Sequence, residues 1–423
     1  MTTLRFLNGT KTIGGNIIEI ANGDSRVIMD FGVAADLTGQ TVAEAIAQHH
    51  LPNLPDLLLP NQTTKFKHQA IFISHLHLDH MGALRYLQNH DIPIYMSADG
   101  LKLYQLLMAQ GVEPQVTNLR PLADQETITV GSLKVTGFLS DHDVIAPMAL
   151  LIEDGKHKFM HSGDVRIGGY HQDRVNHWSD FVKNQLDVYL TEATTYSFAS
   201  EQPQMVTGDH HEPVLTEQDL PERLTTKIKT SQQVIVLNPY PRNVERLIRF
   251  NETALAAGRP MLWEPDYAQL IRTFAPEQQI KEISEQPVND APANTTYYPW
   301  AEIEQQLQQN PQQFTLQNSW ANHDRLKSFT GGLYLHANGE PLGDYDPRFA
   351  QLQDFLTENH WTIESCGASG HAKRADILAL ATKINARRTV PWHSFKPELL
   401  AADLKQTKTE PWLPELDLYY RFD

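Results

Sequence analysis

Three histidines and one aspartate lie within six residues of this chain, at His75, His77, Asp79 and His80. Imidazole nitrogens and carboxylate oxygens are ligands that catalytic zinc takes readily. The run follows an apolar β-type segment at 71–73, and side chains two residues apart on an extended segment point the same way. His75 and His77 can therefore face one ion while Asp79 and His80, where the chain turns into a helix, face a second. With nineteen histidines in 423 residues, such a run arises by chance only about once in five hundred chains.

The spacing H-x-H-x-D-H resembles the signature of the metallo-β-lactamase superfamily, and further segments resemble the other motifs of that family in the same order. The first of these segments, 27–32, contains Asp30. The other three, 140–142, 159–164 and 390–393, end at His142, Asp164 and His393, respectively. The resemblance implies that Asp30 orients the metal loop from behind the ligands. It also implies two ligand sets, bridged by Asp164: His75, His77 and His142 for one zinc, and Asp79, His80 and His393 for the other.

Two segments narrow the resemblance to the β-CASP branch, which includes ribonuclease J and the polyadenylation endonuclease. They are 369–372, which reads Ser-Gly-His-Ala, and 390–393; upstream, the Thr-Glu-Ala-Thr segment at 191–194 resembles the acidic motif of that branch. The resemblance implies that His371 protonates the leaving 3′ oxygen and that Glu192 orients it. An ordinary turn histidine and a surface carboxylate are the alternative interpretations of these two residues.

Phosphate contacts are expected from Ser369, from the backbone amides around Gly370, and from a helix start near Arg242 and Asn243. Arg242 and Arg246 are four apart on that helix and equally fit a solvated stripe. Two segments depart from the β-CASP pattern: the acidic motif lacks the usual Glu-Ser-Thr order, and residues 143–147 read Asp-Val-Ile-Ala-Pro instead of a Ser-Ile-Pro type. Neither departure removes a ligand, but both bear on the shape of the substrate pocket.

The elements that must position these residues fall into two patterns. Apolar β-type runs alternate with turns and a few helices up to about residue 195, which suits the αββα sandwich that the resemblance implies. A polar connector at 200–221 is followed by strand, helix and strand patterns at 233–237, 243–257 and 261–263, which predict a parallel sheet. A helix at 375–384 and a strand at 389–391 then return the chain to the first domain. We predict a metallo-β-lactamase domain at 1–205 and 361–423, with an inserted parallel α/β domain at 206–360.

Composition and net charge indicate the cellular compartment of the protein and limit the partners that it can bind. No apolar run approaches eighteen residues and no leader-like segment opens the chain, so a cytoplasmic protein without membrane contact is expected. The single cysteine, Cys366, fits a reducing compartment; a buried filler is a better interpretation than a metal ligand. A net charge of −16 argues against a general nucleic-acid-binding surface. The chain stops about thirty residues after His393, so the C-terminal domain of ribonuclease J is expected to be absent, and the oligomeric state is left open.

These observations together predict a zinc-dependent nuclease that acts on single-stranded RNA. Its two zinc ions, which manganese could replace, would hold a hydroxide that attacks the phosphorus and leaves 5′-phosphate and 3′-hydroxyl ends. Internal cleavage and exonuclease action from the 5′ end are both open. The alternatives are a hydrolase of DNA or another phosphodiester or ester, favoured by the acidic charge, and a catalytically silent scaffold, disfavoured because every ligand position is filled.

Overall fold

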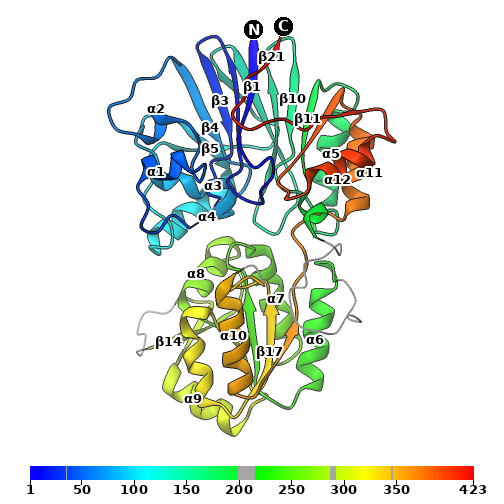
Figure 1. The fold of residues 1–423 in the computed structure, drawn as a ribbon. Helices are drawn as coiled ribbons and strands as arrows, with labels where there is room; N and C mark the ends of the chain where they lie inside the picture. Colours follow the sequence, from blue (N-terminus) through cyan, green and yellow to red (C-terminus); the bar gives the residue numbers. More distant parts are fainter. Residues whose placement is uncertain (35, 199–214, 286–291, 344–345) are drawn as a thin grey trace. The chain divides into compact units, whose positions relative to one another are not determined.

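The computed structural model describes residues 1–423 except 35, 199–214, 286–291 and 344–345. The chain divides into two compact units, which we call unit 1 (residues 1–201 and 370–423) and unit 2 (residues 202–369) (Figure 1). None of the helices in the described part of the chain combines the length and the apolar composition that crossing a bilayer requires. Each unit has its own sheets and its own core.

Unit 1 contains two sheets that face each other. The first has the order β21-β1-β2-β3-β4-β5-β6, with bounds Tyr420–Phe422, Thr2–Asn8, Ile17–Asn22, Ser25–Met29, His68–Phe72, Ile94–Ser97 and Leu119–Leu122. The second has the order β20-β19-β11-β10-β9-β8-β7, with bounds Glu410–Pro411, Arg388–Trp392, Val188–Glu192, Lys158–His161, Met148–Glu153, Leu133–Leu139 and Thr127–Val130. Side chains from both sheets, among them Phe6, Val27, Leu150 and Trp392, form one buried cluster between them. The apolar runs of the sequence thus become the two inner faces of a sandwich.

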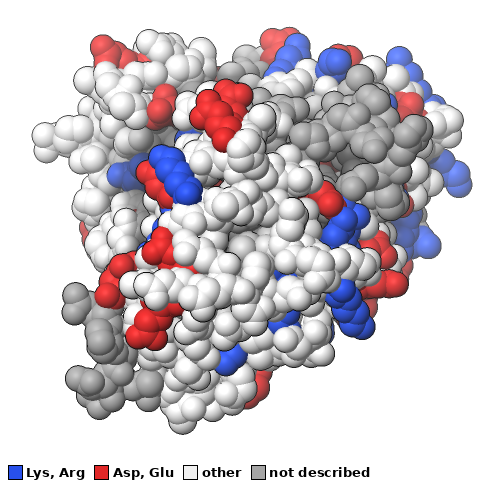
Figure 2. Space-filling view, turned by 90° about the horizontal axis from the view of Figure 1, so that it is seen from below, with Lys and Arg blue, Asp and Glu red and all other residues white. Residues whose placement is uncertain are grey.

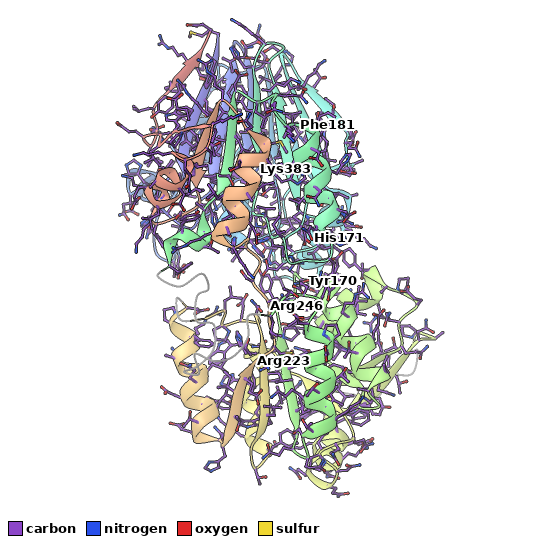
Figure 3. The ribbon with its side chains drawn as sticks, turned by 90° about the vertical axis from the view of Figure 1, so that its right-hand side faces the viewer. Tyr170, His171, Phe181, Arg223, Arg246 and Lys383 are labelled. Carbon is purple, nitrogen blue, oxygen red and sulfur yellow. The ribbon has the colours of Figure 1, made fainter. Side chains whose placement is uncertain are left out.

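Helices cover the outer faces of this sandwich (Figure 1). The first sheet is flanked by α1, α2, α3, α4 and the 3₁₀ turn η1, with bounds Val42–Ala47, Pro55–Leu58, Leu78–Met81, Ala98–Ala109 and Gly82–Tyr86. The second sheet is flanked by α5, α11, α12 and η2, with bounds Gln172–Phe181, Arg374–Ile384, Pro397–Leu404 and Thr194–Ser197. Trp178 of α5 and Ile377 of α11 pack with Tyr189 in a second buried cluster. Lys383 of α11 also donates a hydrogen bond to Ser179 of α5 at 2.8 Å (Figure 3).

The segment that follows unit 2 completes the second sheet of unit 1. Strand β19 lies parallel to β11, with Glu192 opposite Trp392. Parallel neighbours need a long crossover connection, and here the whole of unit 2 lies between them in the sequence. This pairing brings the end of β19, and with it His393, beside the residues that follow Glu192.

Unit 2 is built on a sheet whose strand pairs are all parallel among the described residues. Its order is β15-β14-β13-β16-β12-β17-β18, with bounds Thr295–Pro299, Ile280–Ser284, Met261–Trp263, Thr315–Gln317, Ile235–Pro239, Gly332–Ala337 and Trp361–Ser365. The helices are α6, α7, α8, α9, η3 and α10, with bounds Leu220–Thr230, Val244–Ala256, Pro265–Phe274, Trp300–Gln309, Trp320–Ser328 and Pro347–Glu358. The predicted fold class, a two-sheet sandwich with an inserted parallel α/β segment, is confirmed.

One predicted boundary differs from the structure. A break at residue 360 would assign the strand at 361–365 to the returning segment of the first domain. That strand, β18, instead pairs in parallel with β17 and belongs to unit 2. The sequence of 361–365 is typical of a strand whether it belongs to the first domain or to the inserted one. Only the identity of the strand that it pairs with decides between these two assignments.

Cys366 follows β18 and is buried. Burial raises the pKa of its thiol to about 12. Because the thiolate is the reactive form, we expect Cys366 in the folded protein to react with an aromatic disulfide reagent at pH 8 at least about a hundredfold more slowly than in the denatured chain. Spectrophotometric thiol titration with and without denaturant measures both rates; equal rates would contradict the buried placement.

Candidate metal centre

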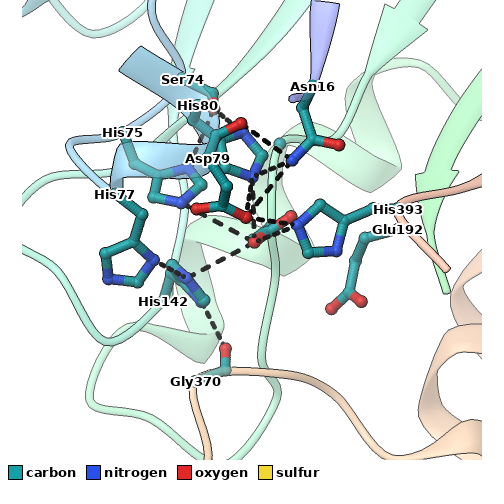
Figure 4. Close-up of polar contacts among 12 residues, drawn as sticks. Asn16, Ser74, His75, His77, Asp79, His80, His142, Glu192, Gly370 and His393 are labelled. Carbon is teal, nitrogen blue, oxygen red and sulfur yellow. Dashed lines mark hydrogen bonds and ion pairs between the residues drawn. The ribbon is translucent and has the colours of Figure 1, made fainter. Parts of the chain in front are cut away.

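Two groups of side chains in unit 1 are arranged so that each could hold a metal ion (Figure 4). The first consists of His75, His77, His142 and Asp164; the second consists of Asp79, His80, Asp164 and His393. Within each group the ligand atoms lie within 4.8 Å of one another. Asp164 belongs to both groups, so the two candidate sites share a carboxylate.

The ends of four strands deliver these side chains. His75 to His80 occupy the segment from the end of β4 into α3, His142 follows β8, Asp164 follows β10 and His393 follows β19. Strands β8, β10 and β19 run in the same direction within the second sheet, because β8 and β10 are each antiparallel to β9 and β19 is connected to β10 through parallel pairs. Their carboxyl ends therefore meet at one edge, although His393 lies more than two hundred positions beyond Asp164 in the sequence.

The Asp164 carboxylate is the centre of the arrangement. Its Oδ2 atom lies 3.2 Å from Nε2 of His80, 3.5 Å from Nε2 of His393, and 3.7 Å from Nε2 of both His75 and His142. Burial alone would raise the pKa of this carboxyl group, but the surrounding histidines outweigh burial and hold it well below its usual value. Asp164 is therefore an anion at the point where the imidazole rings converge.

Two of the atoms that could bind a metal have no hydrogen-bond partner among the described residues. They are His75 Nε2 and Asp164 Oδ1, and both are buried. Leaving a buried polar atom unsatisfied costs about 1–3 kcal/mol. Burial lowers the pKa of His75 far below its usual value and lowers that of His142 to about 3, so both rings are neutral and keep a lone pair. Neutral imidazoles around a shared carboxylate fit divalent cations, and with no thiolate present they suit zinc and also manganese.

Asp30 hydrogen-bonds to His80 on the side of the ring away from Asp164. Its Oδ2 accepts hydrogen bonds from His80 Nδ1 and His161 Nε2, each at 2.8 Å, and its Oδ1 accepts one from the Ser74 amide at 2.7 Å. With its proton on Nδ1, the ring can present Nε2 to a metal ion. Burial opposes protonation of His80, but Asp164, Asp79 and Asp30 outweigh burial and raise its pKa well above the usual value, so an ion bound here would displace a proton. Burial opposes the charge of Asp30, but His80 and His161 outweigh burial and lower its pKa. Asp30 thus fixes the tautomer and the orientation of a ring in the second site.

Two other rings are fixed in the same manner. The Gly370 carbonyl accepts a hydrogen bond from His142 Nδ1, and the Thr194 hydroxyl lies 2.7 Å from His393 Nδ1. In both rings the other nitrogen, Nε2, faces Asp164. The backbone and a neighbouring hydroxyl therefore preset the ligand atoms before any ion binds.

Gly32 makes room for the metal loop. A Cβ atom at Gly32 would lie 1.6 Å from the Asp79 carbonyl oxygen. The backbone of the first motif and that of the metal loop are joined here by hydrogen bonds from the amide of Phe31 to the His80 carbonyl and from that of Val33 to the Leu78 carbonyl. Any side chain at position 32 would separate these two segments.

His371 and Glu192 form a pair beside the ligands. His371 Nδ1 lies 3.2 Å from Glu192 Oε1 and 4.0 Å from Asp164 Oδ2, and Glu192 Oε2 accepts a hydrogen bond from the Thr194 amide at 2.9 Å. Burial opposes protonation of His371, but Glu192 and then Asp164 outweigh it and raise the pKa of the ring to about 9. His371 is therefore protonated at neutral pH and can donate a proton.

The four residues proposed for phosphate contact have different surroundings. Gly370 directs its carbonyl to His142 in unit 1, and Ser369 is the last residue of unit 2. Asn243 caps α7 by accepting a hydrogen bond from the Arg246 amide, and it donates one to Glu217. Arg242 is buried. A phosphate contact by Ser369, Gly370, Arg242 or Asn243 stays a prediction.

The position of Arg246 differs from one of the two predictions made for it, a solvated stripe of arginines on the helix. A solvated stripe of arginines on α7 would leave this side chain in water, but it is 1% exposed (Figure 3). Its guanidinium forms a buried ion pair with Glu217 and donates to the carbonyls of Ala337 and Ala368. The helical spacing was right, but Arg246 lies on the inner face of the helix, where it joins segments of unit 2.

Sequence reasoning missed two polar residues of the site. Asn16 Nδ2 lies 3.0 Å from His80 Nε2 and 3.4 Å from Asp79 Oδ2. Thr194 supports His393, as described above. Thr194 could have been suspected, because it follows Glu192 in the acidic motif. Asn16 stands at the start of an apolar strand pattern, where nothing local points to a metal.

Comparisons with known proteins agree with this geometry. Residues 30–223 match the family model described as "Beta-lactamase superfamily domain". The chain is 23% identical over 283 residues to "Ribonuclease J 2" of Streptococcus pyogenes, covering 64% of this chain and 47% of that protein. It is also 23% identical over 442 residues to "Ribonuclease J" of Helicobacter pylori, covering 99% of this chain and 59% of that protein. The chain thus spans about half the length of the curated relatives it matches.

A solved structure has the same fold along nearly the whole chain. It is the crystal structure of a protein of unknown function from Enterococcus faecalis V583, with a TM-score of 0.82, 26% sequence identity and 99% coverage of both chains. The fold and the site define an α/β sandwich with a composite His and Asp metal centre. The matched family model, the relatives named ribonuclease J and the fold together support the metallo-β-lactamase superfamily, in its β-CASP branch, as the family of this chain.

We predict that Asp30→Asn weakens metal binding about 10–100-fold, the usual effect of removing a residue that orients a metal-ligating histidine. Asparagine tolerates the left-handed backbone of this position, where φ is 59°, but its amide nitrogen cannot accept the proton of His80. Competition with a chromophoric chelator measures the affinity, and Asp36→Asn on an exposed loop is the matched control. Unchanged affinity in Asp30→Asn would show that His80 does not depend on this carboxylate.

Proposed function

We propose that this chain is a metal-dependent ribonuclease that hydrolyses RNA phosphodiester bonds with two zinc ions and leaves 5′-phosphate and 3′-hydroxyl ends. The observation that carries the proposal is the convergence of two ligand groups on Asp164 beside the His371–Glu192 pair. A shared carboxylate between two cation sites suits in-line displacement at phosphorus, in which both the attacking and the leaving oxygens need stabilisation. Relatives named ribonuclease J support RNA as the substrate.

The ions and the side chains have separate tasks in this proposal. When bound, the ions lower the pKa of a water molecule to form the nucleophile and neutralise charge on the phosphate. His75, His77 and His142 would hold one ion, Asp79, His80 and His393 would hold the other, and Asp164 would contact both. Manganese could replace zinc, because the donors are nitrogen and oxygen atoms only.

His371 supplies the proton for the leaving group. Its Nδ1–H donates to Glu192, so Nε2 carries the proton that the leaving 3′ oxygen would receive. The side chain is 24% exposed, which lets water restore the proton between turnovers. Glu192 acts as a positioning residue, because its other oxygen is held by the Thr194 amide.

The charge of the protein limits how RNA can bind. The net charge is −16, and on the face shown in Figure 2 the described Lys and Arg side chains are interspersed with Asp and Glu. Because affinity for a polyanion depends on phosphate neutralisation, we expect modest affinity and a short stretch of bound single-stranded RNA. We place the activity in the cytoplasm, as the single cysteine suits a reducing compartment.

One assay separates this proposal from its alternatives. Purified protein is incubated with end-labelled single-stranded RNA, with single-stranded DNA of the same sequence, and with an aryl phosphodiester, each with and without chelator. We expect RNA cleavage that chelator abolishes and added zinc or manganese restores, with product lengths showing whether cuts are internal or begin at the 5′ end. Faster cleavage of DNA or of the aryl ester would favour another phosphodiesterase. Metal-loaded protein that cleaves none of them would favour a scaffold.

The metal ligands provide a direct test. Asp79→Ala with His80→Ala removes two donors of one group while leaving the first group intact. We expect the double variant to bind one ion fewer and to lose RNA cleavage. Cleavage at the rate of the parent protein would refute the proposed two-ion mechanism.

We predict that His371→Ala slows RNA cleavage at least about a hundredfold, the usual scale for losing general acid help. Metal content should stay near that of the parent protein, because His371 belongs to neither ligand group. Single-turnover kinetics and elemental analysis measure the two quantities. Loss of an ion from this variant would instead make His371 a ligand.

We also predict a pH dependence that Glu192 controls. His371 holds the proton it donates below its pKa of about 9 and loses it as the pH rises through that value, so cleavage should decline on the alkaline side. Glu192→Gln removes the largest interaction that raises this pKa, so the decline should move to lower pH. Profiles of kcat/KM against pH measure the shift, with Glu398→Gln on the exposed side of α12 as the control. Superimposable profiles for Glu192→Gln and the parent would contradict the role of Glu192.

A further inference from the structure

A second carboxylate, besides Asp164, lies at the first candidate site. Asp143 directly follows the ligand His142, and its Oδ1 lies 3.2 Å from Nε2 of His142 and 3.5 Å from Nε2 of His77. Its side chain is only 14% exposed. Asp143 is therefore a carboxylate beside the nitrogens of two neighbouring ligands, and none of the roles described above uses it.

The local backbone makes room for this carboxylate. A Cβ atom at Gly370 would lie 2.4 Å from Asp143 Oδ1 and 2.8 Å from the ring of His142. Glycine at this position lets the Asp143 carboxylate stand against the ring, while the Gly370 carbonyl holds Nδ1 of the same ring. The placement of Asp143 is thus built into the segment that leads to His371.

Proton positions make this placement unfavourable in the bare protein. The Gly370 carbonyl can only accept a hydrogen bond, so the proton of the His142 ring is on Nδ1 and its Nε2 presents a lone pair. The Nε2 lone pair then faces the Asp143 carboxylate at 3.2 Å. His77 Nδ1 lies 3.1 Å from the same nitrogen and can donate a hydrogen bond to it in one tautomer of His77. A cation between the Asp143 oxygen and His142 Nε2 would offset the repulsion between these two electron-rich atoms.

The separations match those between ligands of one ion. Zinc takes imidazole nitrogen and carboxylate oxygen at about 2.0–2.2 Å, so neighbouring donors around one ion lie roughly 3–3.5 Å apart by geometry. The distances from Asp143 Oδ1 to the two imidazoles, 3.2 and 3.5 Å, fall in this range. His142 cannot donate a hydrogen bond to Asp143, because its proton is on Nδ1.

We propose that Asp143 is an additional ligand of the ion that His75, His77 and His142 hold, an inference that rests on the proposed two-ion centre. With Asp164, this ion then has three imidazoles and two carboxylates, whereas the second ion has two imidazoles and two carboxylates. Five protein donors exceed the four that structural zinc takes, and more oxygen donors and higher coordination favour manganese. The first site is therefore the one with the stronger preference for manganese.

The test measures metal binding without catalysis. Metal-free parent protein and Asp143→Asn are titrated with Mn²⁺, and free Mn²⁺ is followed by electron paramagnetic resonance; zinc is then titrated in competition with a chelator. We expect two ions per parent chain. In Asp143→Asn we expect one site to be weakened at least tenfold for Mn²⁺, and less for zinc, with the other site unchanged. Asp173→Asn, on the exposed side of α5, is the matched control.

The outcomes separate the two proposals. If the parent binds two ions and Asp143→Asn binds both with parental affinity, Asp143 is not a ligand and the proposed ribonuclease function is unaffected. If the parent itself binds fewer than two ions, both proposals fail. If Asp143→Asn does not fold, the visible absorption spectrum of the cobalt-substituted parent protein decides. Weak absorption typical of five or six donors at one ion supports the inference. Strong absorption typical of four donors at both ions overturns it.

Discussion

The arrangement of unit 1 depends on one electrostatic constraint: the imidazoles of four histidines and an ionised Asp164 are held together out of water. Nε2 atoms from four histidines lie within 3.7 Å of a single oxygen of Asp164. Burial opposes charge on Asp164, His75, His80 and His142, so the cluster is costly unless cations occupy it. The fold around the cluster supplies the free energy that keeps it assembled.

That free energy comes from packing away from the ions. The apolar cluster between the two sheets fixes the strands, and the strands then deliver ligands at their carboxyl ends. Supporting contacts complete the alignment: Asp30 for His80, the Gly370 carbonyl for His142, and Thr194 for His393. Each of these hydrogen-bonding groups comes from a different strand end or loop. The geometry of the site therefore depends on the correct packing of all of unit 1.

The acidic composition and the metal centre are compatible on physical grounds. A net charge of −16 repels a polyanion at long range, but screening limits that repulsion to about 8–10 Å at physiological ionic strength. In the proposed centre, two bound cations would be the largest local charges. The proposed additional carboxylate of Asp143 would lower the positive charge at one of them.

The sequence by itself determined the fold class and pointed to the metal loop. The segment from His75 to His80 is local, so spacing alone groups its side chains, and the ordered motifs extended that grouping to His142, Asp164 and His393 by resemblance. Only the tertiary structure could add Asn16, show which imidazoles Thr194 and Asp143 contact, assign β18 to the inserted sheet, and place Arg246 on the inner face of its helix. These features depend on which segments meet across long separations, and side-chain type and periodicity carry no information about that.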